Sequence, residues 1–129
     1  MACVIWRTAC FGALVAMMAA FAAASEKAHA AGAMAIGRCA AYGFAYDYDH
    51  ADDARSAALA KCTDSGCAVV ATVQRSCVAF AIDGRNACGP HGYAVAPRLG
   101  RAENTALQYC YRYGGKDCVI RAWACDGRG

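Results

Sequence analysis

The sequence predicts an α+β fold in which two strand–strand–helix–strand units pack as one small disulfide-stapled domain. The chain has 129 residues and ten cysteines, and its first thirty residues have the pattern of an export signal. The rest repeats itself once, so that Cys62 recurs as Cys110. A charged fraction of 18% and a hydrophobic fraction of 59% exclude a disordered chain, and the length excludes a large multidomain enzyme.

Residues 1–30 contain the three parts of a secretory signal peptide in order. Arg7 precedes an apolar run from Ala9 to Ala24, and Ala28-His29-Ala30 has the small–x–small pattern of a cleavage site. The run is shorter than the roughly 20 residues that span a bilayer. We therefore expect cleavage after Ala30, with a mature chain of residues 31–129 that has no transmembrane segment and lies in the periplasm or outside the cell.

The two repeats cover about residues 33–77 and 79–126 of a single domain. The first strands are expected at Ala33–Gly37 and Val78–Asp83. The second strand of the first repeat alternates aromatic with small or polar residues, which is typical of a half-buried strand and places the aromatic side chains in the core. These aromatic residues are Tyr42, Phe44, Tyr46 and Tyr48, and their counterparts are His91, Tyr93 and Val95.

Alanines four residues apart predict one helix in each repeat, packed closely on a sheet. The positions are Ala54 and Ala58 in the first helix and Ala102 and Ala106 in the second. The third strands, 68–73 and 119–124, are mostly apolar, so we expect them to be buried at the centre of a sheet.

Eight cysteines remain after the signal, and in an exported domain of this size they predict disulfides. A structural zinc site is disfavoured because paired C-x2-C motifs are missing and His50 and His91 stand alone. The layout favours local bridges Cys62–Cys67 and Cys110–Cys118, where a helix end meets the next strand. Matched positions in the two repeats favour Cys39–Cys88 at the hairpins and Cys77–Cys125 at the ends of the third strands. This set of four bridges is one of the 105 pairings that eight cysteines allow.

Four short motifs follow one another along the mature chain: Tyr42-Gly-Phe-Ala-Tyr46, Ala58-Leu-Ala-Lys-Cys62, Cys67-Ala-Val-Val70 and Ala122-Trp-Ala-Cys125. With the duplication they resemble the bacterial secreted family catalogued as domain of unknown function 4189, over roughly Ala33 to Asp126. The resemblance implies an exported, disulfide-bonded α+β domain and carries over no catalytic residue. The chain departs from the family pattern at Thr72-Val73, where a Trp or Phe is common, and in the hairpin cysteines Cys39 and Cys88.

No set of residues predicts a catalytic, metal or cofactor site, so none is assigned and an enzyme is disfavoured. Nucleophilic catalysis needs a thiol or hydroxyl beside a base, and the serines lack a Gly-x-Ser-x-Gly setting. The acidic residues Asp47, Asp49, Asp52 and Asp53 do not fit an EF-hand loop, so we expect them to serve the start of the first helix, with Asp49 as its cap.

The function favoured by these patterns is a non-catalytic interaction module that binds a protein or envelope component. The basic residues are scattered among acidic ones, so nucleic acid is not an expected partner. The alternative is an enzyme or enzyme inhibitor acting at the cell envelope, and a third possibility is a structural protein without a ligand. The candidate surface residues are Asp49, His50, Asp52, Asp53, Tyr111 and Arg112.

Overall fold

The computed structural model describes residues 30–127, which form two successive strand–strand–helix–strand units. The signal peptide predicted at residues 1–30 lies, except for Ala30, outside the described residues. The elements are β1 (Ala31–Ile36), β2 (Tyr42–Tyr48), α1 (Ala51–Lys61), β3 (Ala68–Val73), β4 (Ser76–Asp83), β5 (His91–Ala96), α2 (Leu99–Arg112) and β6 (Cys118–Asp126). The predicted α+β fold class and its repeated element order are confirmed.

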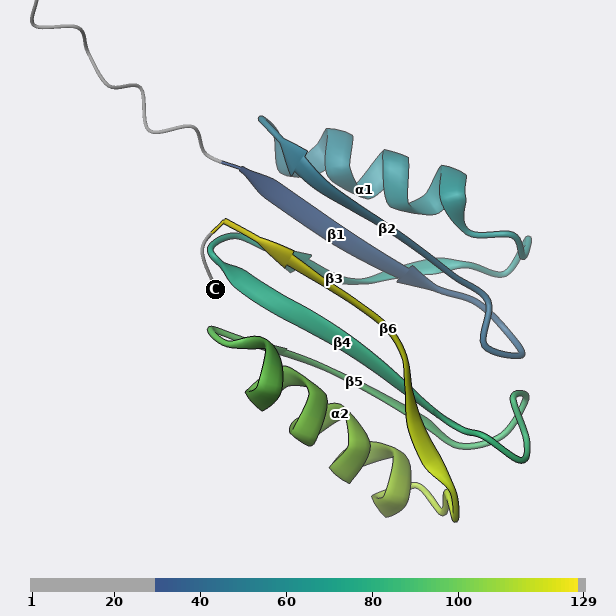
Figure 1. Cartoon of the computed structure of the whole chain (residues 1–129). Helices are drawn as coiled ribbons and strands as arrows, with labels where there is room; N and C mark the ends of the chain where they lie inside the picture. The colour runs from purple at the N-terminus through teal and green to yellow at the C-terminus, as the bar shows by residue number, and fades with distance from the viewer. Residues whose placement is uncertain (1–29, 128–129) are drawn as a thin grey trace, which may run out of the picture.

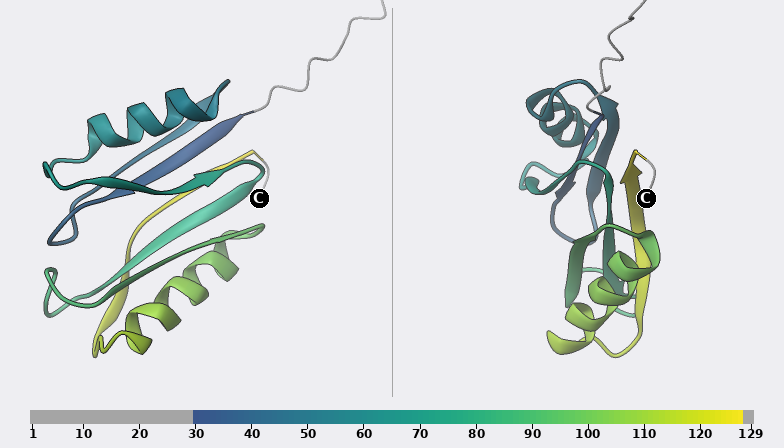
Figure 2. Two further views of the ribbon diagram at one scale, coloured as in Figure 1. Left: turned by 180° about the vertical axis from the view of Figure 1, so that it is seen from behind. Right: turned by 90° about the vertical axis from the view of Figure 1, so that its left-hand side faces the viewer.

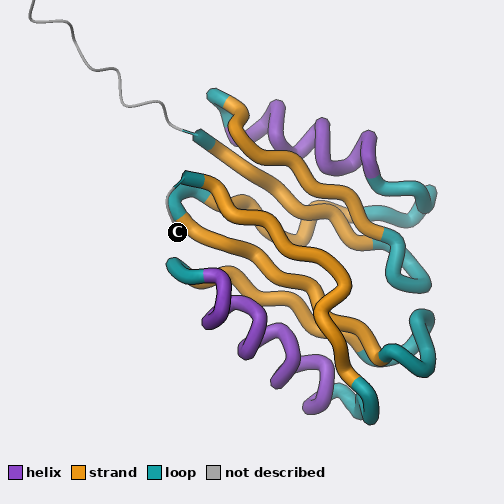
Figure 3. The backbone as a smooth tube through the Cα atoms, in the orientation of Figure 1, coloured by secondary structure: helices purple, strands orange, loops and turns teal. Residues whose placement is uncertain are grey.

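The strands form two three-stranded antiparallel sheets, one from each unit. Their orders are β2-β1-β3 and β5-β4-β6. Helix α1 packs on β2 and β1, and helix α2 packs on β5 and β4. The two helices therefore lie on opposite outer sides of the pair of sheets (Figures 1 and 3). The right-hand view in Figure 2 shows the two units one above the other, with α1 at the top and α2 at the bottom.

The central strands are the first strands of each unit, β1 and β4, and the prediction that the third strands are central was wrong. All six residues of β1 are buried, as are seven of the eight residues of β4. Strands β3 and β6 lie at sheet edges, because β1 and β4 each pair with a hairpin partner on one side and the returning third strand on the other. A mostly apolar sequence does not distinguish an edge strand from a central strand when another layer covers the strand in both positions.

Three apolar clusters hold the layers together. The cluster between the sheets contains the large side chains, including Met34, Val78 and Phe80. The two clusters beneath the helices are made mainly of alanine, as the spacing of Ala54 and Ala58 predicted for α1. Small side chains on both surfaces let each helix approach its sheet closely.

Gly43 and Gly92 occupy matching positions where a helix backbone lies directly on a strand. A Cβ atom at Gly43 would overlap the carbonyl oxygen of Ala58 and lie 2.6 Å from the amide nitrogen of Cys62. A Cβ atom at Gly92 would overlap the carbonyl oxygen of Ala106 in the same way. The two glycines therefore set the distance between helix and sheet in both units.

The aromatic stripe of β2 is only partly in the core, so its assignment to the core was too strong. The face that lies against α1 carries the buried Gly43 and Ala45 instead. Tyr42 and Phe44 pack at the border of the cluster between the sheets, and Tyr46 is 52% exposed. Asp47 has a positive φ of 61°, and beyond it Tyr48 packs against the α1-facing cluster, so the alternation breaks before the strand ends.

Four disulfides join all eight cysteines of the described chain, in the pairs that the sequence layout favoured: Cys39–Cys88, Cys62–Cys67, Cys77–Cys125 and Cys110–Cys118. Cys39–Cys88 links the two hairpin loops and so joins the two units. Each of the other three disulfides lies within one unit. The reason given for Cys77–Cys125 was wrong, since Cys77 lies in β4. That pair forms because Cys77 and Cys125 are direct partners on the neighbouring strands β4 and β6.

A charged pair connects the first hairpin to the loop after α1. The Arg38 guanidinium donates to both carboxylate oxygens of Asp64, at 3.3 and 3.2 Å, and the Arg38 backbone N–H donates to Asp64 Oδ2 at 2.8 Å. The side-chain hydrogen bonds from Arg38, with the backbone bond, lower the pKa of Asp64 to about 2. The folded state therefore binds the ionised form of Asp64 more strongly than the unfolded state does.

We expect Asp64→Asn to reduce the acid sensitivity of folding. Because the pKa of Asp64 is lowered, its contribution is complete above the unfolded pKa of about 3.9 and is lost as the pH falls toward about 2. The variant should be less stable than the parent at pH 7 and closer to it at pH 2. Urea midpoints across this range measure the effect. Asp117→Asn, which removes a single more exposed contact of 3.6 Å to Arg85, is the control, and an equal change in both variants would contradict the prediction.

Candidate binding surface

A groove of about 790 Å3 runs between β5 and α2. Strand β5 and the turn before it contribute a continuous run of residues to its wall, and α2 contributes one stripe. The lining residues are Gly89, Pro90, His91, Gly92, Tyr93, Ala94, Val95, Thr105, Tyr109 and Tyr113.

The β5 side of the groove follows the free edge of a sheet. Neighbouring strand residues point to opposite faces, so a wall made of every residue from 91 to 95 must follow the strand backbone itself. Strand β5 pairs with β4 on one side and is last in the order of its sheet. Alternate backbone N–H and C=O groups of an edge strand point away from its partner and are free to pair with another strand.

The α2 side of the groove is a stripe of residues at helical spacing. Thr105, Tyr109 and Tyr113, the last of which is the C-cap residue of α2, are four residues apart and line the groove together. The rings of Tyr109 and Tyr113 stack with centroids 6.2 Å apart, and the Arg112 guanidinium lies 5.3 Å from the centre of the Tyr109 ring. Tyr113 is 64% exposed, so its ring offers a large apolar surface that α2 holds in place.

Strand β5 itself adds apolar side chains at alternate positions. Tyr93 is 41% exposed and Val95 is 47% exposed, while Gly92 and Ala94 between them are buried against α2. His91 stands at the start of the strand with its ring edge-on to Phe80, 5.9 Å between centroids. The groove thus combines free backbone hydrogen-bonding groups with aromatic surfaces and the hydroxyls of Thr105 and the tyrosines.

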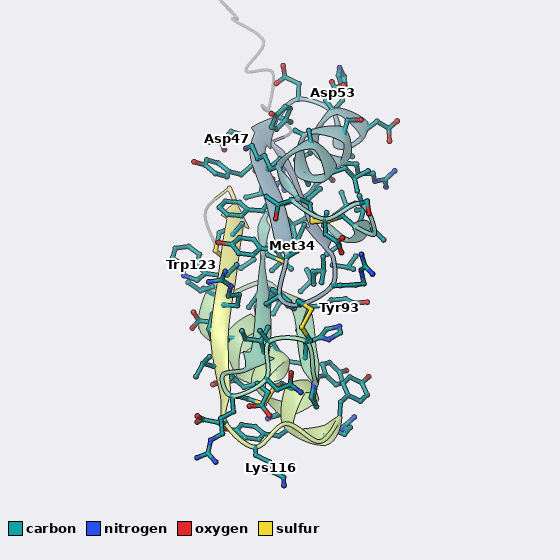
Figure 4. All side chains as sticks on the ribbon, turned by 90° about the vertical axis from the view of Figure 1, so that its right-hand side faces the viewer. Met34, Asp47, Asp53, Tyr93, Lys116 and Trp123 are labelled. Atoms are coloured by element: carbon teal, nitrogen blue, oxygen red, sulfur yellow. A yellow bond between two sulfur atoms is a disulfide. The ribbon has the colours of Figure 1, made fainter. Side chains whose placement is uncertain are left out.

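A second aromatic surface lies on the first unit. The rings of Tyr42, Phe44 and Tyr46 stack in a row along β2, 6.2 and 6.0 Å apart. The Arg121 guanidinium of β6 lies 5.4 Å from the centre of the Tyr42 ring. Trp123, also on β6, is 51% exposed and projects away from the domain (Figure 4).

The structure does not bring the predicted surface residues into one site. Asp49 and His50 precede α1, and Asp52 and Asp53 lie in its first turn, all exposed. Tyr111 and Arg112 are at the end of α2, on the opposite outer layer of the domain. Figure 4 shows this separation, with Asp53 at one end of the molecule and Lys116, which follows α2, at the other.

The acidic cluster has only local contacts in the structure. His50, not Asp49, is the N-cap residue of α1, and it makes no side-chain cap hydrogen bond, so the capping role predicted for Asp49 was wrong. Asp52 pairs with Arg55 of the same helix, at 3.0 Å. Within residues 30–127, no three His, Cys, Asp or Glu side chains are grouped so as to hold a metal ion.

Sequence reasoning placed two candidate residues on α2 but did not predict the groove. It singled out Tyr111 and Arg112, whereas Tyr109 and Tyr113 are the tyrosines that face β5. The four-residue spacing of Thr105, Tyr109 and Tyr113 marks one helix face and was the available signal. That this stripe lies along the edge of β5 depends on how α2 sits on the sheet, which periodicity does not show.

The comparisons with known proteins identify a family and no further relative. The family model for a domain of unknown function (DUF4189) matches residues 31–125. Neither a curated protein nor a solved structure matches the chain. Across the described residues, no helix has both the length and the apolar character needed to cross a membrane. Because the match spans both strand–strand–helix–strand units, from the start of β1 to Cys125 of β6, the chain belongs to the DUF4189 family.

Proposed function

We propose that this protein is an exported, non-catalytic binding module that holds an extended polypeptide segment in the groove between β5 and α2. The groove along the free edge of β5 is the observation that carries the proposal. A partner segment would pair with β5 as a fourth strand, and the strand–strand hydrogen bonds would supply much of the affinity. Alternate side chains of the segment would contact Tyr109 and Tyr113, which supplies the specificity.

Export is supported by two features of the chain. Four disulfides in so short a domain are typical of proteins that fold in an oxidising compartment, such as the periplasm or the exterior of the cell. The sequence of residues 1–30 has the order of a signal peptide, and β1 starts at Ala31, directly after the expected cleavage site.

The rigidity of the groove favours binding over chemistry. Both of its walls belong to one unit, and that unit contains the Cys77–Cys125 and Cys110–Cys118 bridges. The second bridge joins the end of α2 to the start of β6, so the α2 wall cannot move far from the sheet. A preformed groove loses little conformational entropy when a segment binds.

Tyr109→Ala and Tyr113→Ala should each weaken peptide binding by about tenfold, the loss typical of an aromatic contact at the centre of an interface. The probe is a set of linear peptides selected from a random displayed library on the purified, oxidised protein, with affinities measured by calorimetry. Tyr111→Ala is the matched control, since Tyr111 is on the same helix and 51% exposed but does not line the groove.

Four outcomes would count against this function. Selection of no peptide, or equal losses in all three tyrosine variants, would show that the groove is not the binding site. Binding of soluble peptidoglycan fragments that depends on Tyr109 and Tyr113, with no peptide binding, would make the ligand a glycan. Peptides that bind with a helical signature in circular dichroism would contradict pairing with β5.

A further inference from the structure

Asp126, the last residue of β6, has an unusual environment. Its exposure is 0%, and neither carboxylate oxygen has a hydrogen-bond partner among the described residues. Buried carboxylates in folded proteins are paired with a cation or hydrogen-bonded, because an isolated charge in the interior loses its hydration without compensation. A carboxylate in this position therefore calls for a nearby cation or hydrogen-bond donor.

The side chain of Asp126 lies beside the start of the first strand. A Cβ atom placed on Gly32 would be 3.6 Å from Asp126 Cβ, with Val73 on its other side. Figures 1 and 2 show the beginning of β1 next to the end of β6 in each view. Ala31, one residue before Gly32, is also fully buried. The backbone nitrogen of Ala31 therefore belongs to the residue directly next to the glycine that lies beside Asp126.

We propose that Asp126 is the counter-ion of the amino terminus that cleavage after Ala30 creates. This inference rests on the export part of the proposed function. A leader peptidase would add water across the Ala30–Ala31 peptide bond, leaving a carboxylate on Ala30 and an amine on Ala31. An α-amine has a pKa near 7.7–8.0 and is mostly protonated at neutral pH, so the new terminus brings a positive charge to the carboxylate.

Each of the two charges explains the burial of the other. A buried ammonium at Ala31 without a counter-ion would be as costly as the unpartnered carboxylate, whereas a charge-assisted hydrogen bond between them offsets both penalties. Before cleavage the same nitrogen is a neutral amide in the chain. Processing would thus complete the fold, and the mature domain would be more stable than its precursor.

Among the described residues, Arg75 is a competing source of positive charge. It lies in the turn between β3 and β4, and a Cβ atom on Gly127 would be 3.5 Å from its Cα. Arg75 is exposed, with a positive φ of 50°, and it forms no ion pair with Asp126 in the structure. The experiment must therefore distinguish an Ala31 ammonium from an Arg75 guanidinium.

The test uses the full chain, exported from a bacterial host by its own leader. Intact mass and amino-terminal sequencing should find a chain that starts at Ala31. An amine-reactive ester at neutral pH should then label the α-amine at least about tenfold more slowly in the native protein than in urea, because labelling requires local opening. Lys61 and Lys116 are exposed and serve as internal standards in the same sample.

Variants separate the ion pair from other causes of protection. Asp126→Asn should restore fast labelling of the α-amine and lower the urea midpoint. Asp49→Asn, which removes an exposed carboxylate, should change neither. Arg75→Gln should also change neither, and a loss of stability equal to that of Asp126→Asn would overturn the inference in favour of the guanidinium.

The remaining outcomes are equally decisive. An exported chain that starts at Ala31 but labels its α-amine as fast as Lys61 and Lys116 would overturn the ion pair and leave export intact. A chain that keeps residues 1–30, or starts elsewhere, would overturn the cleavage itself. If Asp126→Asn does not fold, the labelling rate of the parent protein relative to its lysines still decides the question.

Discussion

Replacing Cys39 and Cys88 together with serine should lower the free energy of unfolding by about 4 kcal/mol, since the bridge closes a long loop in the unfolded chain. The two cysteines are 49 residues apart, and their bridge connects the two units through their hairpin loops. Both residues are exposed, so the new hydroxyls would face water and add no cost of burial. Urea unfolding of the double variant and the parent, without reductant, measures the difference.

The control for this effect is Cys62→Ser with Cys67→Ser. Its bridge spans 5 residues within the first unit, so the same chain-entropy argument gives a smaller loss of about 2 kcal/mol. A loss for the Cys39 and Cys88 variant no larger than that of the control would show that the core between the sheets holds the two units together without the bridge.

Gly43→Ala should destabilise the protein by about 3 kcal/mol, the upper end of the range for an overpacked site. The added methyl would meet the backbone of α1 at Ala58 and Cys62, and a backbone cannot rotate away as a flexible side chain can. Either α1 moves away from its sheet, which opens the alanine cluster beneath it, or the edge strand β2 bends away from α1. Thermal and urea unfolding of the variant measure the loss.

Gly100→Ala is the matched control, because nothing lies within 4 Å of a Cβ atom at this position in α2. The same change should there be neutral or stabilise the helix by up to about 1 kcal/mol, through helix propensity alone. Gly92→Ala should resemble Gly43→Ala, since Gly92 has the equivalent contact with Ala106 in the second unit. Equal stability of the Gly43 and Gly100 variants would contradict the close packing of helix on strand.

The disulfide pairs show how far the sequence alone could lead. Cys62 and Cys67 lie within a few residues of each other, and their counterparts repeat the arrangement, so local pairing followed from the order of the elements. The pair Cys77–Cys125 was expected for a reason that the structure corrects, because Cys77 belongs to β4 and faces Cys125 across one ladder. The matching positions in the two repeats therefore predicted the right pair. What brings the two cysteines together is the pairing of β4 with β6, which are far apart in the sequence.

The candidate binding groove shows where sequence reasoning stopped. The alternation of β5 and the four-residue spacing on α2 each predict which residues share a face. Whether the two faces meet, and whether the edge of β5 stays open, depends on the sheet order and on the close approach of α2 at Gly92. Asp126 was missed for a similar reason, since a single acidic residue at a strand end gives no sign in the sequence that Gly32 lies against it.

By itself the sequence specified the element order, the duplication and the presence of a disulfide framework. These properties are local or repeat along the chain, so periodicity and spacing record them. Only the tertiary structure decided that β1 and β4 are the central strands, that β5 presents a free edge to α2, and that Asp126 is buried beside the start of β1. Each of these depends on contacts between segments far apart in the chain, whose free energies come from packing and register and not from the residues of any one segment.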